Sequence, residues 1–151
     1  MATPRRADLR TLYVAEPPAR YDQRPAAVVD ASLVAALLFA EPEQAAAAQR
    51  LSTCRPTAPN LLPYELANVA VNKLRRGDAE AAVRASLAEL AAIGIEWHAV
   101  EPTLALDLAA RYRLTAYDAA YLVLAARLKA PLLTFDRRLG EAAATHLAGL
   151  E

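Results

Sequence analysis

The chain has 151 residues, enough for one domain with a single core, and its hydrophobic share of 56% excludes a wholly disordered protein. Its 17 basic and 17 acidic side chains balance, so any contact with nucleic acid must be local. The apolar runs are too short to span a bilayer, and a single cysteine cannot form an internal disulfide. We therefore expect a cytoplasmic protein without a membrane segment.

The first 25 residues differ in composition from the rest. They contain five arginines and four prolines without a sustained hydrophobic period. An arginine pair is present but no continuous apolar segment follows it, so we expect neither a secretory nor a twin-arginine signal. Residues 1–25 are interpreted as a mobile N-terminal extension, and residues 26–151 as one folded domain.

The folded part is expected to begin with a buried strand. The apolar run at residues 26–29 ends at Asp30, which is typical of a parallel strand with an acid at its exit. Two helical segments follow at residues 32–40 and 43–53, separated by a proline that can occupy a first helical turn.

Proline governs the interpretation of the next two segments. Residues 55–59 contain two prolines and are not expected to form a central strand, although Thr57 and Ala58 could form a short one at the edge. Residues 61–76 are expected to form an amphipathic helix with a proline in its first turn and a glycine after its end. Glu65 lies beside the apolar stripe of this helix, either at the edge of the core or facing a pocket.

The second half continues the alternation. Asp78 is expected to cap a helix over residues 79–93, and residues 95–100 fit a strand. A helix from residue 102 to about 111 follows. His98, in that strand, and His146, on a late helix, share no ligand spacing and do not predict a zinc site.

Residues 115–139 predict a helix, a loop and a strand with a carboxylate near each end. Thr115 is a credible N-cap, and Asp118 has the capping-box spacing at the positive end of the helix. Residues 132–135 form a short apolar and aromatic run that ends at Asp136. A final helix is expected from about residue 137 to 147.

Strands that alternate with helices predict a three-layer α/β/α sandwich with a central, mostly parallel sheet. In such a sheet the strand exits and the starts of the following helices lie on one edge. Asp30, Asp118 and Asp136 would meet there, with Glu65 on a neighbouring helix. Converging like charges need a cation, and an all-oxygen ligand set favours Mg²⁺ or Mn²⁺. The sequence contains no glycine-rich phosphate loop, so it gives no sign of a nucleotide cofactor.

Four segments carry a resemblance to a known family. They are VVDASL around Asp30, PYELANV around Glu65, LTAYDAAYLVLAA around Asp118 and LLTFDRRL around Asp136. In order and content they resemble the four acidic motifs of PIN-domain ribonucleases, most closely the VapC toxins of bacterial toxin-antitoxin modules. The similarity extends from about Ala26 to the C-terminus. It implies a metal-dependent endoribonuclease acting on single-stranded RNA, inhibited by a VapB-like antitoxin and usually forming a homodimer.

The resemblance also implies roles for individual residues. Asp30 and Asp118 would be the main metal ligands, and Glu65 and Asp136 would complete the acidic pocket directly or through water. Thr134 matches a hydroxyl residue two positions before the last acid. Ser32 matches a small polar residue after the first acid, and both are given supporting roles. The N-terminal extension departs from the pattern, because these toxins commonly begin almost at the first strand.

Two other functions would fit part of this pattern. A phosphatase of the haloacid dehalogenase kind also starts with a strand ending in Asp, but it requires a second Asp where this chain has Ser32. A non-catalytic PIN-like module could use the alanine-rich helices at residues 32–53 only to hold a partner. Arg137 and Arg138, directly after the last acid, are either RNA contacts or the first turn of a solvated helix.

Overall fold

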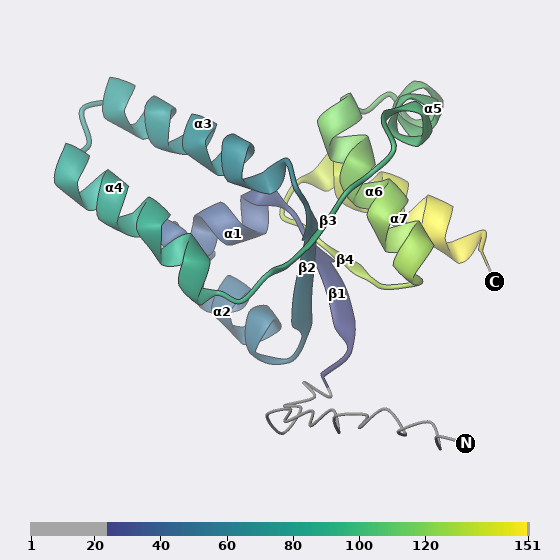
Figure 1. Cartoon of the computed structure of the whole chain (residues 1–151), viewed down its shortest axis with the longest axis horizontal. Coiled ribbons are helices and arrows are strands. Elements are labelled where there is room, and N and C mark those ends of the chain that lie inside the picture. Colours follow the sequence, from purple (N-terminus) through teal and green to yellow (C-terminus); the bar gives the residue numbers. More distant parts are fainter. Residues whose placement is uncertain (1–23, 151) are drawn as a thin grey trace, which may run out of the picture.

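The computed structural model describes residues 24–150, and these form four strands and seven α-helices (Figure 1). The expected mobile extension lies outside the described residues apart from Arg24 and Pro25. All strand pairings are parallel, in the order β3-β2-β1-β4. The strands are β1 (Ala26–Val29), β2 (Arg55–Pro59), β3 (Glu96–His98) and β4 (Leu132–Leu133).

The helices lie on both sides of the sheet, with α1 to α4 on one side and α5 to α7 on the other (Figure 1). The predicted α/β sandwich with a central parallel sheet is therefore confirmed. The helices are α1 (Ala31–Leu38), α2 (Gln44–Ser52), α3 (Leu62–Arg75), α4 (Glu80–Ala88), α5 (Pro102–Tyr112), α6 (Ala116–Leu128) and α7 (Arg137–Ala148), with a 3₁₀ turn η1 at Glu89–Ala92.

The core is centred on β1 and α6. Val28 and Val29 are fully buried because β1 has a paired strand on each side and helices over both faces. Seven consecutive residues of α6, from Ala119 to Ala125, are buried. A helix that is apolar on all sides belongs in the interior, and α6 packs against β1, β2 and the neighbouring helices α5 and α7.

The prediction for residues 55–59 was wrong. They form β2, which lies inside the sheet between β1 and β3. The backbone N–H groups of a strand point alternately to its two neighbours, and Arg55 N donates to Pro25 O on the β1 side. Pro56, on the β3 side, precedes the first residue paired with β3, and Pro59 follows the last residue paired with β1. Neither proline removes a bond that the sheet makes.

The capping residues expected from the sequence are confirmed only in part. Thr115 caps α6 as predicted, and Asp30 and Asp136 cap α1 and α7 with their carboxylates. Asp78 does not cap α4, because the chain enters that helix one residue later, at Ala79. After α3, Gly77 takes a φ of 95°, a conformation that favours glycine, and so ends the helix as expected.

Within residues 24–150, no helix is both long enough and apolar enough to cross a bilayer. The longest apolar helix, α6, has 13 residues, well short of the roughly 20 that a bilayer requires.

Candidate active site

Asp30 lies at the exit of β1 and is only 5% exposed. Its carboxylate accepts hydrogen bonds from Leu33 N at 3.1 Å, Ser32 Oγ at 2.8 Å and Thr134 Oγ1 at 2.7 Å. Burial raises the pKa of Asp30, and these donors oppose that shift by favouring the charged form. The carboxylate is thus fixed in position before any ligand arrives.

Ser32 and Thr134 join the exit of β1 to the loop that follows β4. Their hydroxyl oxygens lie 3.3 Å apart, and each also accepts a backbone N–H, from Phe135 and Asp136 respectively, at 2.8 Å. The two residues expected to support the acids therefore contact Asp30 directly. They also fix the loop that carries Asp136.

Glu65 comes from the first turn of α3 and accepts a hydrogen bond from the hydroxyl of Tyr121 on α6. Tyr121 is buried. Burial, followed by the charges of Asp118 and Asp30, raises the pKa of Glu65. Burial and the charge of Glu65 raise the pKa of the Tyr121 hydroxyl far above its usual range, so the tyrosine remains a donor.

Tyr121 is a site residue that sequence reasoning missed. Its sequence signal was its position three residues after Asp118, which places both on one side of the helix. The contact with Glu65 spans 56 positions of the chain. It depends on how α3 packs relative to α6, which no local pattern reveals.

Asp118 occupies the first turn of α6 and is half-buried. Thr115 Oγ1 accepts a hydrogen bond from Asp118 N at 3.1 Å and donates one to Asp118 Oδ2 at 2.7 Å. The Asp118 carboxylate is therefore held by the capping hydroxyl rather than by a backbone N–H. Its charge raises the pKa values of Glu65 and Tyr121, which places it beside them.

Asp136 stands apart from the other three acids. Its side chain is exposed, and its carboxylate accepts the N–H of Leu139 at 2.8 Å as the cap of α7. The charges that raise the pKa of Tyr121 are those of Glu65, Asp30 and Asp118, and that of Asp136 is not among them. The structure thus brings three of the predicted acids together and leaves the fourth at the margin, linked through Thr134.

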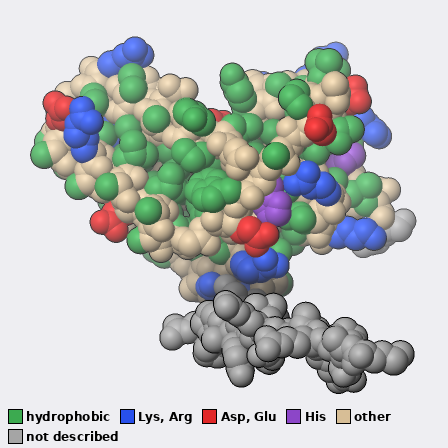
Figure 2. All heavy atoms as spheres, viewed as in Figure 1, with side chains coloured by type: hydrophobic (Ala, Val, Ile, Leu, Met, Phe, Trp, Pro, Cys, Tyr) green, Lys and Arg blue, Asp and Glu red, His purple; other side chains and the backbone are tan. Residues whose placement is uncertain are grey.

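One of the acids, Glu65, opens onto a cavity between α3 and α6. Its volume is about 470 Å³, and Glu65 is part of its lining, so this side chain faces a pocket rather than only the edge of the core. In Figure 2 the surface is hollowed between the part formed by α3 and the part formed by α5 and α6.

A divalent cation such as Mg²⁺ needs oxygen ligands, and the carboxylates of the acids supply them. Among residues 24–150, no three Asp, Glu, His or Cys side chains lie close enough together to hold an ion by themselves. Mg²⁺ does not require such a cage, since it usually keeps several waters and binds through one or two carboxylates. Asp30, Glu65 and Asp118 offer only oxygen donors, and their mutual repulsion would be relieved by a cation. These residues fit Mg²⁺ or Mn²⁺ held partly through water.

The two arginines after the last acid have partners within the chain. Arg137 Nε lies 2.8 Å from Glu141 Oε1, and the guanidinium of Arg138 donates to the backbone carbonyl of Arg113. Both belong to the first turn of α7, as the solvated-helix interpretation expected. A contact of either with RNA stays a prediction.

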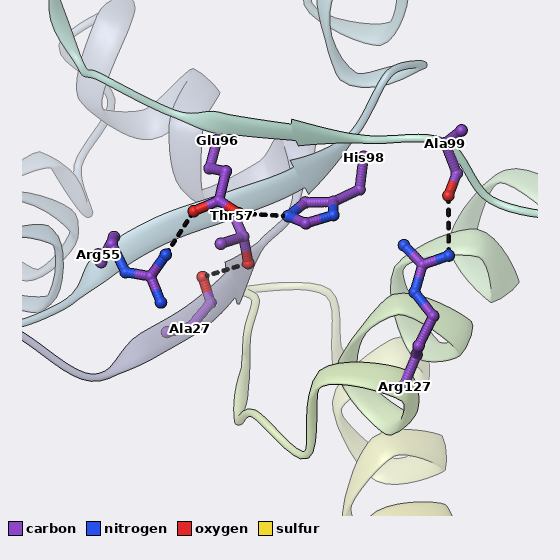
Figure 3. A network of polar contacts seen from close by, with 7 residues as sticks. All are labelled: Ala27, Arg55, Thr57, Glu96, His98, Ala99 and Arg127. Carbon is purple, nitrogen blue, oxygen red and sulfur yellow. Dashed lines mark hydrogen bonds and ion pairs between the residues drawn. The ribbon is translucent and has the colours of Figure 1, made fainter. Parts of the chain in front are cut away.

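The two histidines lie in separate networks. His98 Nε2 is 3.0 Å from Glu96 Oε1, without the alignment of a hydrogen bond, and Glu96 also pairs with Arg55 on β2 (Figure 3). His146 Nδ1 lies 3.1 Å from the hydroxyl of Tyr112. Each histidine therefore has its own partner, in a different part of the described structure from the other.

Known proteins share this architecture and sequence pattern. A family model described as PIN domain matches residues 27–144, a range that includes all four acids. The protein named Ribonuclease VapC3 of Pyrobaculum aerophilum is 33% identical over 120 residues, which cover 76% of this chain and 92% of that protein. The crystal structure of PAE2754 from Pyrobaculum aerophilum has the same fold, with a TM-score of 0.64 and 24% identity over 84% of this chain and 97% of the other. The chain belongs to the PIN-domain family and, within that family, is of the VapC type.

Proposed function

We propose that this protein is a Mg²⁺- or Mn²⁺-dependent endoribonuclease that hydrolyses phosphodiester bonds in RNA in the cytoplasm. The observation that carries the proposal is the proximity of Asp30, Glu65 and Asp118, which come from three separate segments of the chain, beside a cavity that Glu65 lines. The name of the Pyrobaculum aerophilum relative, a ribonuclease, supports RNA as the substrate.

Each acid has a proposed task. A divalent cation, when bound, neutralises phosphate charge and lowers the pKa of a bound water. Asp30, held by three donors, and Asp118, held by Thr115, are proposed to bind the ion directly. Glu65 has one oxygen engaged by Tyr121 and offers the other to the ion or to water. Asp136 completes the acidic set from the loop that Thr134 fixes.

The physiological role that we propose is that of a toxin in a VapBC-type module. A VapB-like antitoxin would bind and inhibit the nuclease, and the active species would be a homodimer. The VapC type of the chain supports these partners. On this proposal, expression of the chain without its antitoxin arrests growth.

The direct test is incubation of the purified protein with total RNA in Mg²⁺ or Mn²⁺, with a chelator in a parallel reaction. We expect cleavage with the metals and none with the chelator. Asp30→Asn and Asp118→Asn should each lower the cleavage rate by at least about 100-fold, since they remove proposed ligands rather than outer partners. Asparagine remains a good N-cap, so Asp30→Asn should still fold.

Asp107→Asn is the matched control, because Asp107 is an exposed acid on α5 outside the cavity lining. It should cleave at the wild-type rate. Cleavage that persists in chelator would contradict the metal-dependent mechanism. Full activity of Asp30→Asn or Asp118→Asn would contradict the assignment of these residues to the active site. Harmless expression of soluble protein in its native host would favour the non-catalytic binding module instead.

A further inference from the structure

Two exposed tyrosines flank the converging acids. Tyr64 directly precedes Glu65 on α3 and is 76% exposed, and Tyr117 directly precedes Asp118 on α6 and is 64% exposed. Both rings line the same cavity as Glu65. Two aromatic rings therefore stand in solvent at the mouth of the acidic pocket, outside the apolar core.

Tyr117 also borders a second cavity. This neighbouring space has a volume of about 360 Å³, and its walls are mostly apolar, including Val100, Pro102, Ala105 and Ala120. Leu61 and Tyr117 line both cavities. The tyrosine thus separates the pocket lined by Glu65 from a pocket suited to a flat, weakly polar group.

Single-stranded RNA has the matching alternation of groups. Each phosphate is followed by a base whose planar face can stack on an aromatic side chain when it is unpaired. The chain has a formal net charge of zero, so no overall positive field raises its affinity for RNA. Local contacts must supply that affinity. With a cation at the acids to offset their repulsion of phosphate, the acidic pocket and the aromatic-walled apolar pocket beside it would suit one phosphate and the base next to it.

We propose that Tyr117 and the apolar cavity beside it form a subsite for one unstacked nucleobase of single-stranded RNA, with Tyr64 as a second stacking surface. The inference rests on the proposed function, because it assumes that the scissile phosphate lies at the acids. It adds a binding site for the base, which is distinct from the residues that hold the ion.

The test measures binding, so it does not depend on cleavage. A fluorescein-labelled single-stranded 12-nucleotide RNA is titrated with protein in Mg²⁺, and anisotropy gives the Kd. All proteins carry Asp30→Asn to keep the RNA intact, and the protein with this single substitution is the parent. Tyr117→Ala should raise the Kd by about 5- to 100-fold, the range expected for loss of one base-stacking contact. Tyr117→Phe keeps the ring and should stay within about twofold of the parent.

Two controls isolate the stacking contact. Leu106→Ala removes an apolar side chain that is 63% exposed on α5 and lies outside the lining of both cavities, so it should leave the Kd unchanged. RNAs with a single abasic residue, scanned along the strand, should include one for which Tyr117→Ala no longer weakens binding. A blunt RNA duplex should bind equally to both proteins, because its bases are stacked within the helix.

The outcomes separate this inference from the proposed function. Equal Kd values for Tyr117→Ala and the parent overturn the subsite, and an intact cleavage reaction would then leave the nuclease proposal standing. Weakened binding without any metal-dependent cleavage by the wild type would keep the subsite and remove the nuclease. Failure of the parent to bind RNA removes the subsite, and the cleavage assay on the wild type then decides the nuclease proposal by itself. If Tyr64→Ala or Tyr117→Ala converts a dimer to a monomer in sedimentation, this surface joins two copies of the chain and the subsite is overturned.

Discussion

Asp30 is a carboxylate almost removed from water and held there by hydroxyl and backbone donors. Removing a charged group from solvent is costly, and its burial does raise the pKa. Its place at the exit of β1 was predictable, because an apolar run that ends in Asp is a local signal. The contact with Thr134 spans 104 positions. From the sequence alone, only the family resemblance suggested it.

The raised pKa of Glu65 leads to a prediction about stability. Its carboxyl is more easily protonated in the folded chain than at its ordinary pKa of 4.5, so the charged form opposes folding. Without divalent cations, Glu65→Gln should therefore raise Tm at pH 7. The gain should disappear below about pH 4.5, where Glu65 is protonated in both the folded and unfolded states. Thermal unfolding followed by circular dichroism across this pH range measures the effect.

A control variant tests whether the gain in Tm is specific to Glu65. Glu80→Gln removes an exposed acid from the first turn of α4, far from the cavity, and should not reproduce the gain at pH 7. Added Mg²⁺ should narrow the difference between Glu65→Gln and wild type, since only the wild type offers a charged ligand there. A lower Tm for Glu65→Gln at pH 7 in chelator would show that the hydrogen bond with Tyr121 outweighs the cost of burying the Glu65 charge beside Asp118 and Asp30.

Among the elements, α6 and β2 differed most in how well the sequence predicted them. The start and cap of α6 followed from local patterns, whereas its end and its burial on nearly all sides were not predicted. The rule that proline avoids central strands failed for β2. That rule concerns lost hydrogen bonds, and each proline lies beyond the residues of β2 that pair with the strand its nitrogen faces. Which residues pair with each neighbour is a property of three strands together and is not readable from one.

The central place of α6 can be tested by core truncation. Leu124 is fully buried on this helix, within the main hydrophobic cluster. Leu124→Ala should lower the free energy of unfolding by about 2–5 kcal/mol, from lost burial and the cavity left behind. Leu106→Ala, on the exposed side of α5, should change it by no more than about 0.5 kcal/mol. Denaturant titration compares the two, and equal losses would contradict the placement of α6 in the core.

At the scale of the whole molecule, the alternation of strands and helices sufficed to predict a parallel α/β sandwich. The order β3-β2-β1-β4 was not predicted, because alternation does not say which strands become neighbours. The convergence of the acids followed in outline from the shared edge of a parallel sheet. The marginal place of Asp136 did not, since it depends on the loop after β4 and on the cap of α7.

The domain boundary is a further testable proposal. The family model begins at residue 27, and Arg24 donates to the carbonyls of Leu51 and Ser52 at 3.4 and 3.2 Å. A chain that starts at Arg24 should keep its cleavage activity and its Tm within about 2 °C. A chain that starts at Ala26 also loses the bond from Arg55 N to Pro25 O and should melt lower. Loss of activity on removal of residues 1–23 alone would make them part of the nuclease.

The pairing of β1 with β4 has a consequence for synthesis on the ribosome. These two strands are among the first and last elements of the described chain, yet they are direct neighbours in the sheet. Until residues 132–134 emerge, β1 lacks one of its two neighbours and Asp30 lacks the hydroxyl of Thr134. A nascent or prematurely terminated chain therefore carries Asp30 without all of its hydrogen-bond donors. If the proposed function holds, this order of assembly delays the finished nuclease site until translation is nearly over.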